Sequence, residues 1–343
     1  MRHLRSSLKS GLLAFSGVAL LLLLPPGLGA QTCISQAEMD AATRNGIENV
    51  ALGTARAIAA TGVSAVTSAI APQVANQASG ILSSVAAAAP LVRGASFVAQ
   101  NLYLLDATDL PVNVSSTQFF CAASDPALHV VFNLGQLPSA LYAIAMLHAT
   151  GVARPQQLTL IFAQPAAGAQ GPSPNSWKLA GFAYKPLTIA GHDGVWYWRQ
   201  ARMFAQQKQN WNAYFYYETA RALVVPVDFV SSSNLNKLLR EENAVKPAGL
   251  PGSQPMQLTS GAQSFAITNL HTDEYLGALN LVVHYKTGSV ADPTATRQQI
   301  VQLMQGLLAA HPELRQAFQG MWVYAEAPGQ DPFGIEMPMR QIP

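Results

Sequence analysis

Charged residues are scarce in this 343-residue chain: Lys, Arg, Asp and Glu make up 11% of it, against about 25% in typical proteins. Of the 20 basic and 18 acidic residues, three basic and no acidic ones lie in residues 1–30. Residues 31–343 therefore contain 17 basic and 18 acidic residues, which gives a formal net charge of −1. Because phosphate contacts supply most nucleic-acid affinity, this balance argues against nucleic acid as a partner. Neutral polar side chains must dominate the surface, which suits an exported protein but also suits a protein that docks onto a partner.

Sequence signatures of the common catalytic classes are missing as well. Residues 31–343 contain no Gly-x-Ser-x-Gly, Ser-x-x-Lys, His-Glu-x-x-His or Cys-x-x-Cys pattern, and no phosphate-binding or dinucleotide-binding glycine loop. Exported hydrolases and redox enzymes commonly show one of these patterns. Their absence favours a non-catalytic protein, and we expect neither a cofactor nor a metal.

A single long hydrophobic run is present, and it lies at the N-terminus. Arg2, Arg5 and Lys9 precede a 13-residue apolar core, Leu12 to Leu24, which prolines end just before Gly29-Ala30. A bilayer span needs about 20 apolar residues. The layout therefore predicts a signal peptide over residues 1–30, cleaved near Ala30, and export to the periplasm or the extracellular space. A retained membrane anchor is the alternative.

Cysteine is almost absent, with Cys33 and Cys121 the two in the chain. An oxidising compartment permits a disulfide between them, which would tie the mature N-terminus to a predicted strand. Two separate buried thiols are the alternative, and the sequence does not decide between these.

Residues 31–92 are rich in alanine and read as helical. Ser35-x-x-Glu38 is a capping-box pattern, which predicts that the first helix begins there. Pro72 and Gly80 are expected to divide the stretch into separate helices.

The same region carries an apolar stripe at helical spacing, formed by Val63, Val66, Ile70, Val74, Ile81 and Val85. No charged residue occurs from Ala57 to Val92. These helices are therefore expected either to pack on the body of the protein or to form a membrane-surface or self-associating segment of the cell envelope.

Residues 93–190 change to an alternating period, which predicts strands in an antiparallel β-sandwich-like domain. The loop at 165–176 is rich in proline, glycine and serine. The predicted strands are Ser96–Leu105, Val112–Cys121, His129–Asn133, Ala140–His148, Gln157–Gln164 and Trp177–Tyr184.

The C-terminal third begins after a proline-rich and glycine-rich linker, residues 246–257. Residues 258–343 are predicted to form a ββααββ unit, in which Asp292-Pro293 starts the first helix. Together with residues 191–245, described next, these regions predict an α+β fold.

Residues 194–226 resemble one tetratricopeptide repeat, a pair of antiparallel helices in which small and large residues interlock. The first helix would carry Tyr197, Ala201 and Phe204, and the second Ala213, Tyr217, Ala220 and Leu223, with Pro226 after it. Stacked repeats normally bury their faces against at least two more units. The resemblance therefore implies a lone hairpin that leans on another domain.

The hairpin also concentrates aromatic residues, with nine between Trp196 and Tyr217. Four of them are consecutive and must spread around most of a helical turn, so some must meet another domain or water. Either the neighbouring domains clamp the hairpin, or it presents an aromatic ridge to a protein, peptide or glycan partner. The candidate binding residues are Trp196, Trp198, Trp211, Tyr214 and Tyr217.

One polar cluster offers a catalytic alternative. His192-Asp193 lies between glycines, and a third partner such as His148 or Asp273 would complete a general-base or metal site. The same residues are also those that a tight turn prefers, and His271-Thr-Asp-Glu274 is read likewise as a solvated loop. The leading hypothesis remains an exported, non-catalytic binding protein, followed by an atypical exported hydrolase or metal-dependent enzyme, and by an envelope component.

Overall fold

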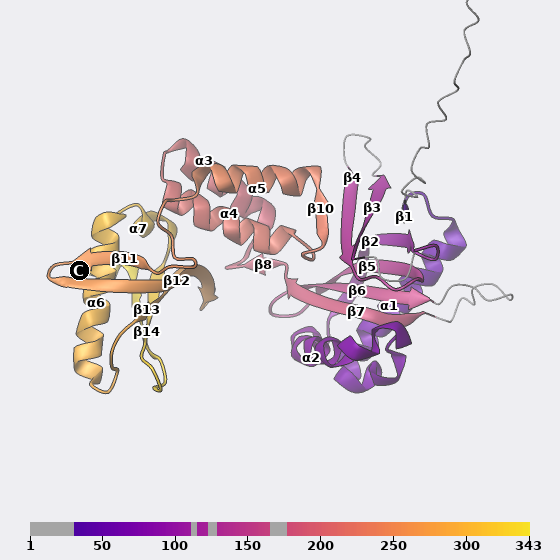
Figure 1. The fold of residues 1–343 in the computed structure, drawn as a ribbon, viewed down its shortest axis with the longest axis horizontal. Coiled ribbons are helices and arrows are strands. Elements are labelled where there is room, and N and C mark those ends of the chain that lie inside the picture. Colours follow the sequence, from indigo (N-terminus) through magenta and orange to yellow (C-terminus); the bar gives the residue numbers. More distant parts are fainter. Residues whose placement is uncertain (1–30, 111–114, 123–128, 165–176) are drawn as a thin grey trace, which may run out of the picture. The chain divides into compact units, whose positions relative to one another are not determined.

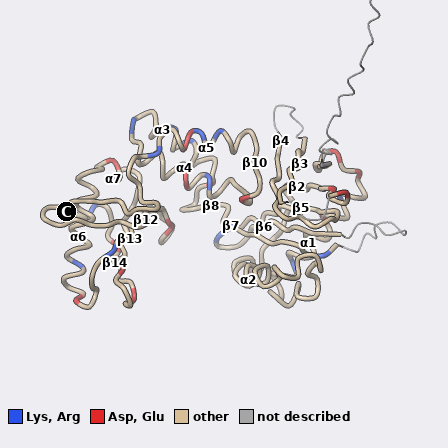
Figure 2. The backbone as a smooth tube through the Cα atoms, viewed as in Figure 1, with Lys and Arg blue, Asp and Glu red and all other residues tan. Residues whose placement is uncertain are grey.

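The computed structural model describes residues 31–110, 115–122, 129–164 and 177–343 (Figure 1). The predicted signal peptide, the start of the strand predicted from Val112 and the whole loop at 165–176 lie outside the described residues. Two large sheets, a two-stranded sheet of β8 (Thr188–Ile189) and β9 (His192–Asp193), and several helices confirm the predicted α+β class. Figure 2 shows how sparsely charged residues are spread along the described chain.

The first sheet has eight strands in the order β10-β4-β3-β1-β2-β5-β6-β7. Neighbours are antiparallel, except that β1 and β3 run parallel. The predicted strands join into this one sheet, to which the unpredicted β1 and β10 are added. The bounds are β1 Gln31–Ser35, β2 Ser96–Asp106, β3 Ser116–Ala122, β4 His129–Gly135, β5 Leu141–Thr150, β6 Gln156–Gln164, β7 Lys178–Pro186 and β10 Val230–Ser232.

The N-terminal helices start later than the capping-box pattern predicts. Glu38 does accept a hydrogen bond from the Ser35 amide, at 3.0 Å, but Ser35 ends strand β1. Helix α1 (Ala41–Thr61) is instead capped by Asp40, which accepts from the Thr43 amide at 2.9 Å. The prediction at Gly80 was also wrong, because this glycine lies inside α2 (Ala78–Ala88). The remaining helical turns are short 3-10 helices at Gly62–Ala65, Thr67–Ala69, Pro72–Gln77 and Ala89–Val92.

The uncharged helices cover the first sheet. Helix α1 packs against β2 and β5, and α2 packs against β7. Val66, Val74, Ile81 and Val85 of the predicted stripe are all buried in the core of this sheet. The packing favours the first of the two alternatives for this region, helices that lie on the body of the protein. No helix in the described part of the chain is long and apolar enough to cross a membrane.

The two cysteines form a disulfide that links β1 to β3. The Cα atoms of Cys33 and Cys121 lie 4.9 Å apart across the parallel strand pair. Of the two alternatives that the sequence leaves open, the structure therefore has the disulfide. Because disulfides persist in oxidising compartments, it is compatible with an exported protein.

The second sheet has five strands in the order β11-β12-β13-β14-β15. The predicted strand pairs are present, and β11 is added because it begins inside the predicted linker. Strands β13 and β14 are parallel, and the connection between them carries helices α6 and α7. Asp292 caps α6 as predicted. The bounds are β11 Met256–Ser260, β12 Gln263–Tyr275, β13 Ala278–Lys286, α6 Pro293–Ala310, α7 Leu314–Ala317, β14 Gly320–Glu326, β15 Phe333–Pro338 and a final 3-10 helix, Met339–Gln341.

Candidate binding site

Helices α3 (Gly194–Gln206) and α4 (Asn210–Val224) form a hairpin, and α5 (Ser233–Val245) follows it. All seven residues that carry the repeat resemblance are buried: Tyr197, Ala201, Phe204, Ala213, Tyr217, Ala220 and Leu223. Close contact at the start of α3 requires a glycine, because a Cβ atom on Gly194 would lie 2.4 Å from Val224 Cγ1. The hairpin shares one hydrophobic core with the second sheet, so it packs on a neighbouring sheet, as a lone hairpin should.

Helix α4 is buried all round from Trp211 to Tyr217. Tyr214, Phe215, Tyr216 and Tyr217 are consecutive, yet each is at most 9% exposed. Phe215 packs on Phe318, with ring centroids 6.0 Å apart, and the Tyr216 hydroxyl donates to the Ala317 carbonyl at 2.8 Å. A helix that is apolar all round is a buried helix. The aromatic run is therefore mainly a core element, clamped by its neighbours.

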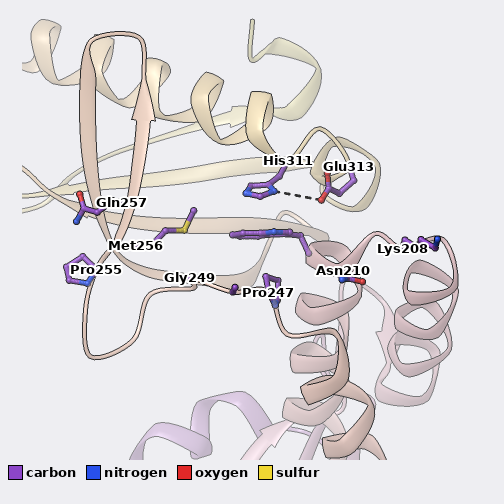
Figure 3. Close-up of a pocket in the computed structure, with 11 residues that line it drawn as sticks. Lys208, Asn210, Pro247, Gly249, Pro255, Met256, Gln257, His311 and Glu313 are labelled. Carbon is purple, nitrogen blue, oxygen red and sulfur yellow. Dashed lines mark ion pairs between the residues drawn. The ribbon is translucent and has the colours of Figure 1, made fainter.

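A pocket of about 610 Å³ opens where the turn between α3 and α4 meets two other segments (Figure 3). His311 and Glu313 lie on one side of it, and Pro247 and Gly249 of the predicted linker lie on the other. We call this the Trp211 pocket. Its lining is Lys208, Asn210, Trp211, Pro247, Ala248, Gly249, Pro255, Met256, Gln257, His311 and Glu313.

A stacked pair of rings forms one wall of the pocket. The centroids of Trp211 and His311 lie 3.9 Å apart, with the planes inclined by 31°. Burial lowers the pKa of His311, and Glu313, whose carboxylate lies 3.9 Å from Nδ1, acts in the opposite direction. The imidazole is therefore held towards its neutral form, in which it offers a flat surface with one donor and one acceptor.

Polar groups surround this apolar wall. Lys208, Asn210 and Gln257 are exposed, and Glu313 is half-buried. Lys208 has φ +62°, a left-handed conformation that is uncommon for a residue other than glycine. Asn212 ties helix α4 to the segment that carries Glu313, because its side-chain amide donates to the Glu313 carbonyl at 2.7 Å. The arrangement combines a rigid apolar wall with an adaptable polar rim.

The other predicted binding aromatics do not form one exposed ridge with Trp211. Trp211 is itself only 8% exposed, and Tyr214 and Tyr217 are buried as well, but of these three only Trp211 lines the pocket. The half-buried Trp196 stacks on His192 at 3.7 Å. The Trp198 indole donates to the Glu241 carboxylate at 2.6 Å, and the guanidinium of Arg202 lies 4.5 Å from the centre of its ring. Although burial alone would raise the pKa of Glu241, hydrogen bonds from Arg202 and Trp198 lower it. These groups serve the packing of α3 against α5.

Among the residues that the structure describes, none joins His192 and Asp193 as a third catalytic or metal-binding partner. Asp193 caps α3 by accepting from the Trp196 amide at 2.7 Å, while His192 stacks on Trp196. His148 lies in β5, where burial and then Lys185 lower its pKa. His271 and Asp273 lie within strand β12, so the prediction of a solvated loop was wrong. Among the described residues, no three His, Cys, Asp or Glu side chains gather in a way that could hold a metal ion.

Comparison with known proteins adds no assignment to this geometry. No protein-family model matches the chain, and neither does any curated protein or solved structure. Function must therefore be argued from the residues themselves.

Sequence reasoning found Trp211 but missed most of the pocket. No sequence motif marks His311, and Pro247, Pro255 and Met256 lie in the segment predicted to be a linker, residues 246–257. A usable signal existed: His311-Pro312-Glu313 ends a strongly periodic helix, so polar side chains were to be expected at a helix terminus. Their meeting with Trp211 depends on tertiary packing alone.

Acidification below pH 6.5 is expected to destabilise the protein in part through His311. Because the folded-state pKa lies below the ordinary 6.5, the unfolded chain binds this proton first as the pH falls. The free energy of unfolding should then decrease with falling pH, whereas above about pH 7 this group contributes no slope. His311→Gln should flatten the curve, as measured by urea denaturation between about pH 5 and about pH 8.

The charged group that faces His311 is Glu313, and Lys208 lines the same pocket without a contact to the imidazole. The matched control is His129→Gln, which changes an exposed histidine at the start of β4. His311→Gln also removes the ring contact with Trp211, which changes the free energy of unfolding by the same amount at every pH. The test is therefore the slope of the free energy of unfolding against pH. Identical slopes for wild type and His311→Gln would contradict the assignment.

Proposed function

We propose that this chain is an exported binding protein without catalytic activity, whose tetratricopeptide-like hairpin offers the Trp211 pocket to a peptide segment of a partner protein. The N-terminal hydrophobic run and the disulfide support a periplasmic or extracellular location. The repeat-like interlocking of α3 and α4 supports a role in recognition.

One observation carries the proposal: the aromatic hairpin contributes a wall to an open pocket. Trp211 is held by His311 on one face and by Phe215 within the core, with a centroid distance of 6.1 Å. Rigid Trp side chains flanked by polar groups are typical of residues that dominate protein binding. Met256, next to it, is a flexible apolar side chain that adapts to different partners.

The lining suits a peptide because it alternates apolar and polar groups over a short distance. Pro247, Pro255 and Met256 offer apolar surface for a side chain of the ligand. Lys208 and Glu313 carry opposite charges, and Asn210 and Gln257 can donate to or accept from a peptide backbone. An extended segment with one apolar anchor and polar neighbours would match this order.

The other two hypotheses from the sequence find less support. At His192-Asp193 the carboxylate is occupied as a helix cap and the imidazole as a stacking partner. An envelope component would expose the N-terminal stripe, but its residues Val66, Val74 and Val85 are buried. We therefore carry forward the binding protein alone.

Filling the pocket tests this proposal without disturbing the core. Residues 31–343, with the disulfide formed, would be used to select binders from a phage-displayed library of random dodecapeptides. Ala248→Trp places a bulky side chain at an exposed position of the lining, and Ala60→Trp does the same at an exposed position of α1. An enriched peptide should bind Ala248→Trp at least ~10-fold more weakly, about 1.4 kcal/mol, and Ala60→Trp as wild type.

Two results would overturn the proposal. Either no sequence is enriched over a surface without protein, or enriched peptides bind Ala248→Trp with unchanged affinity. Titration calorimetry on synthetic peptides distinguishes these outcomes from weak display artefacts.

A further inference from the structure

The second sheet has one face that its core does not use. Leu281, Val283 and Tyr285 of β13 are buried in the core that includes α6. Successive side chains of a strand point to opposite faces, so Val282 and His284 point away from that core. The pairing register places His271, Trp322 and Tyr324 on the same side. None of these three belongs to the core formed with α6.

Aromatic rings occupy this outer face in a continuous row. The Trp322 and Tyr324 planes lie within 15° of each other, at a centroid distance of 6.0 Å. Tyr324 continues to His284 at 4.9 Å, and Tyr275 meets Trp322 edge-on at 5.0 Å. Tyr275 is 44% exposed, and Trp322, Tyr324 and His284 are half-buried. We call these four residues the outer aromatic row.

A second pocket, of about 470 Å³, opens at the Tyr275 end of the row. Its other lining includes Asn280, Gln316, Gln319, Glu336 and Arg340. Within the described part of the chain, the side chains of Glu336 and Arg340 have no hydrogen-bond or ion-pair partner. Gly320 lies beneath the pocket, where a Cβ atom would meet Asn280 Oδ1 at 2.6 Å and Glu336 Oε1 at 2.8 Å. Two acceptor oxygens thus share one small area next to the aromatic row.

We propose that the outer aromatic row and this adjoining pocket bind a neutral oligosaccharide. A pyranose ring has an apolar C–H face that packs on an aromatic ring, and hydroxyls around its edge that both donate and accept hydrogen bonds. The row supplies the aromatic surface, while Asn280, Glu336 and Arg340 supply acceptors and donors.

Charge on this face favours a neutral ligand. Asp273, Glu326 and Glu336 would repel phosphate groups. The positive charges of Lys286 and Arg340 balance part of this negative charge, so an uncharged ligand meets little net charge. Nucleic acids, which stack on aromatic sheets elsewhere, need a basic surface that this face does not have. This second site is separate in its lining residues from the Trp211 pocket and does not depend on it.

The test uses residues 31–343 and four neutral hexasaccharides: cellohexaose, chitohexaose, xylohexaose and maltohexaose. Titration calorimetry should show that at least one of them binds with a dissociation constant below about 1 mM. Tyr275→Ala and Glu336→Gln change accessible side chains and should each weaken that binding several-fold. Trp322→Ala should abolish it. Phe120→Ala, which removes a 60% exposed aromatic from β3, is the matched control and should bind as wild type.

The variant with a filled Trp211 pocket, Ala248→Trp, separates this inference from the proposed function, because it should bind the sugar normally. The inference is overturned if no hexasaccharide binds, if Tyr275→Ala and Glu336→Gln both bind as wild type, or if Ala248→Trp loses the sugar. It is also overturned if Tyr275→Ala weakens the binding of the selected peptides and leaves the binding of the sugars unchanged.

Discussion

The double variant Cys33→Ser/Cys121→Ser is expected to lose about 4 kcal/mol of unfolding free energy, because the disulfide closes a loop with a sequence separation of 88 residues. In the chain-entropy account, removing the link restores freedom to the unfolded chain. Its position increases the effect: Cys33 lies on the strand that connects β2 to β3 in the middle of the first sheet. Urea denaturation of residues 31–343 measures the loss.

The reduced wild-type protein is the control for this prediction. It should unfold at the same urea concentration as the double variant, since both lack the same covalent link. An unchanged midpoint on addition of reductant, with thiol titration showing both cysteines free, would contradict the prediction.

Phe215→Ala is expected to cost about 3–5 kcal/mol, the usual range for a fully buried Phe truncated in a core. Phe215 is 0% exposed and lies between the hairpin and the α7 segment, with rings of Tyr214 and Phe318 at 5.6 and 6.0 Å. Its loss leaves a cavity where α4 meets the C-terminal part of the chain. Thermal and urea unfolding, followed by near-ultraviolet circular dichroism, measure the effect.

Phe120→Ala is the matched control, because it makes the same chemical change at a side chain that is 60% exposed. It should shift the free energy of unfolding by at most ~0.5 kcal/mol. Equal losses in the two variants would show that Phe215 is not enclosed as described.

Strand positions were predictable wherever the alternation of residues was undisturbed. Leu279, Leu281, Val283 and Tyr285 face one way as their spacing indicates, and all four are buried. Caps were harder to place. Ser35 and Glu38 satisfy a capping pattern within a turn, while Asp40 is the residue that caps helix α1. Local hydrogen-bonding patterns do not distinguish a turn after a strand from a helix start.

The candidate site was predictable only in part, because its members come from distant segments. Trp211 stood out within an aromatic cluster, but its burial beside His311 depends on the packing of α4 against the end of α6. Met256 was hidden in a segment whose prolines and glycines indicated a linker. The outer aromatic row was also hidden, since Trp322 and Tyr275 become neighbours only through strand order.

The place of β1 in the first sheet has a consequence for how the chain assembles. This strand lies between β3 and β2, and its partner residues end at Phe120 and Asp106. The backbone groups of β1 therefore form their hydrogen bonds with segments some 70 to 90 positions later in the chain. Contacts this distant slow folding. We therefore expect β1 to pair last, so that the first sheet is completed late in folding.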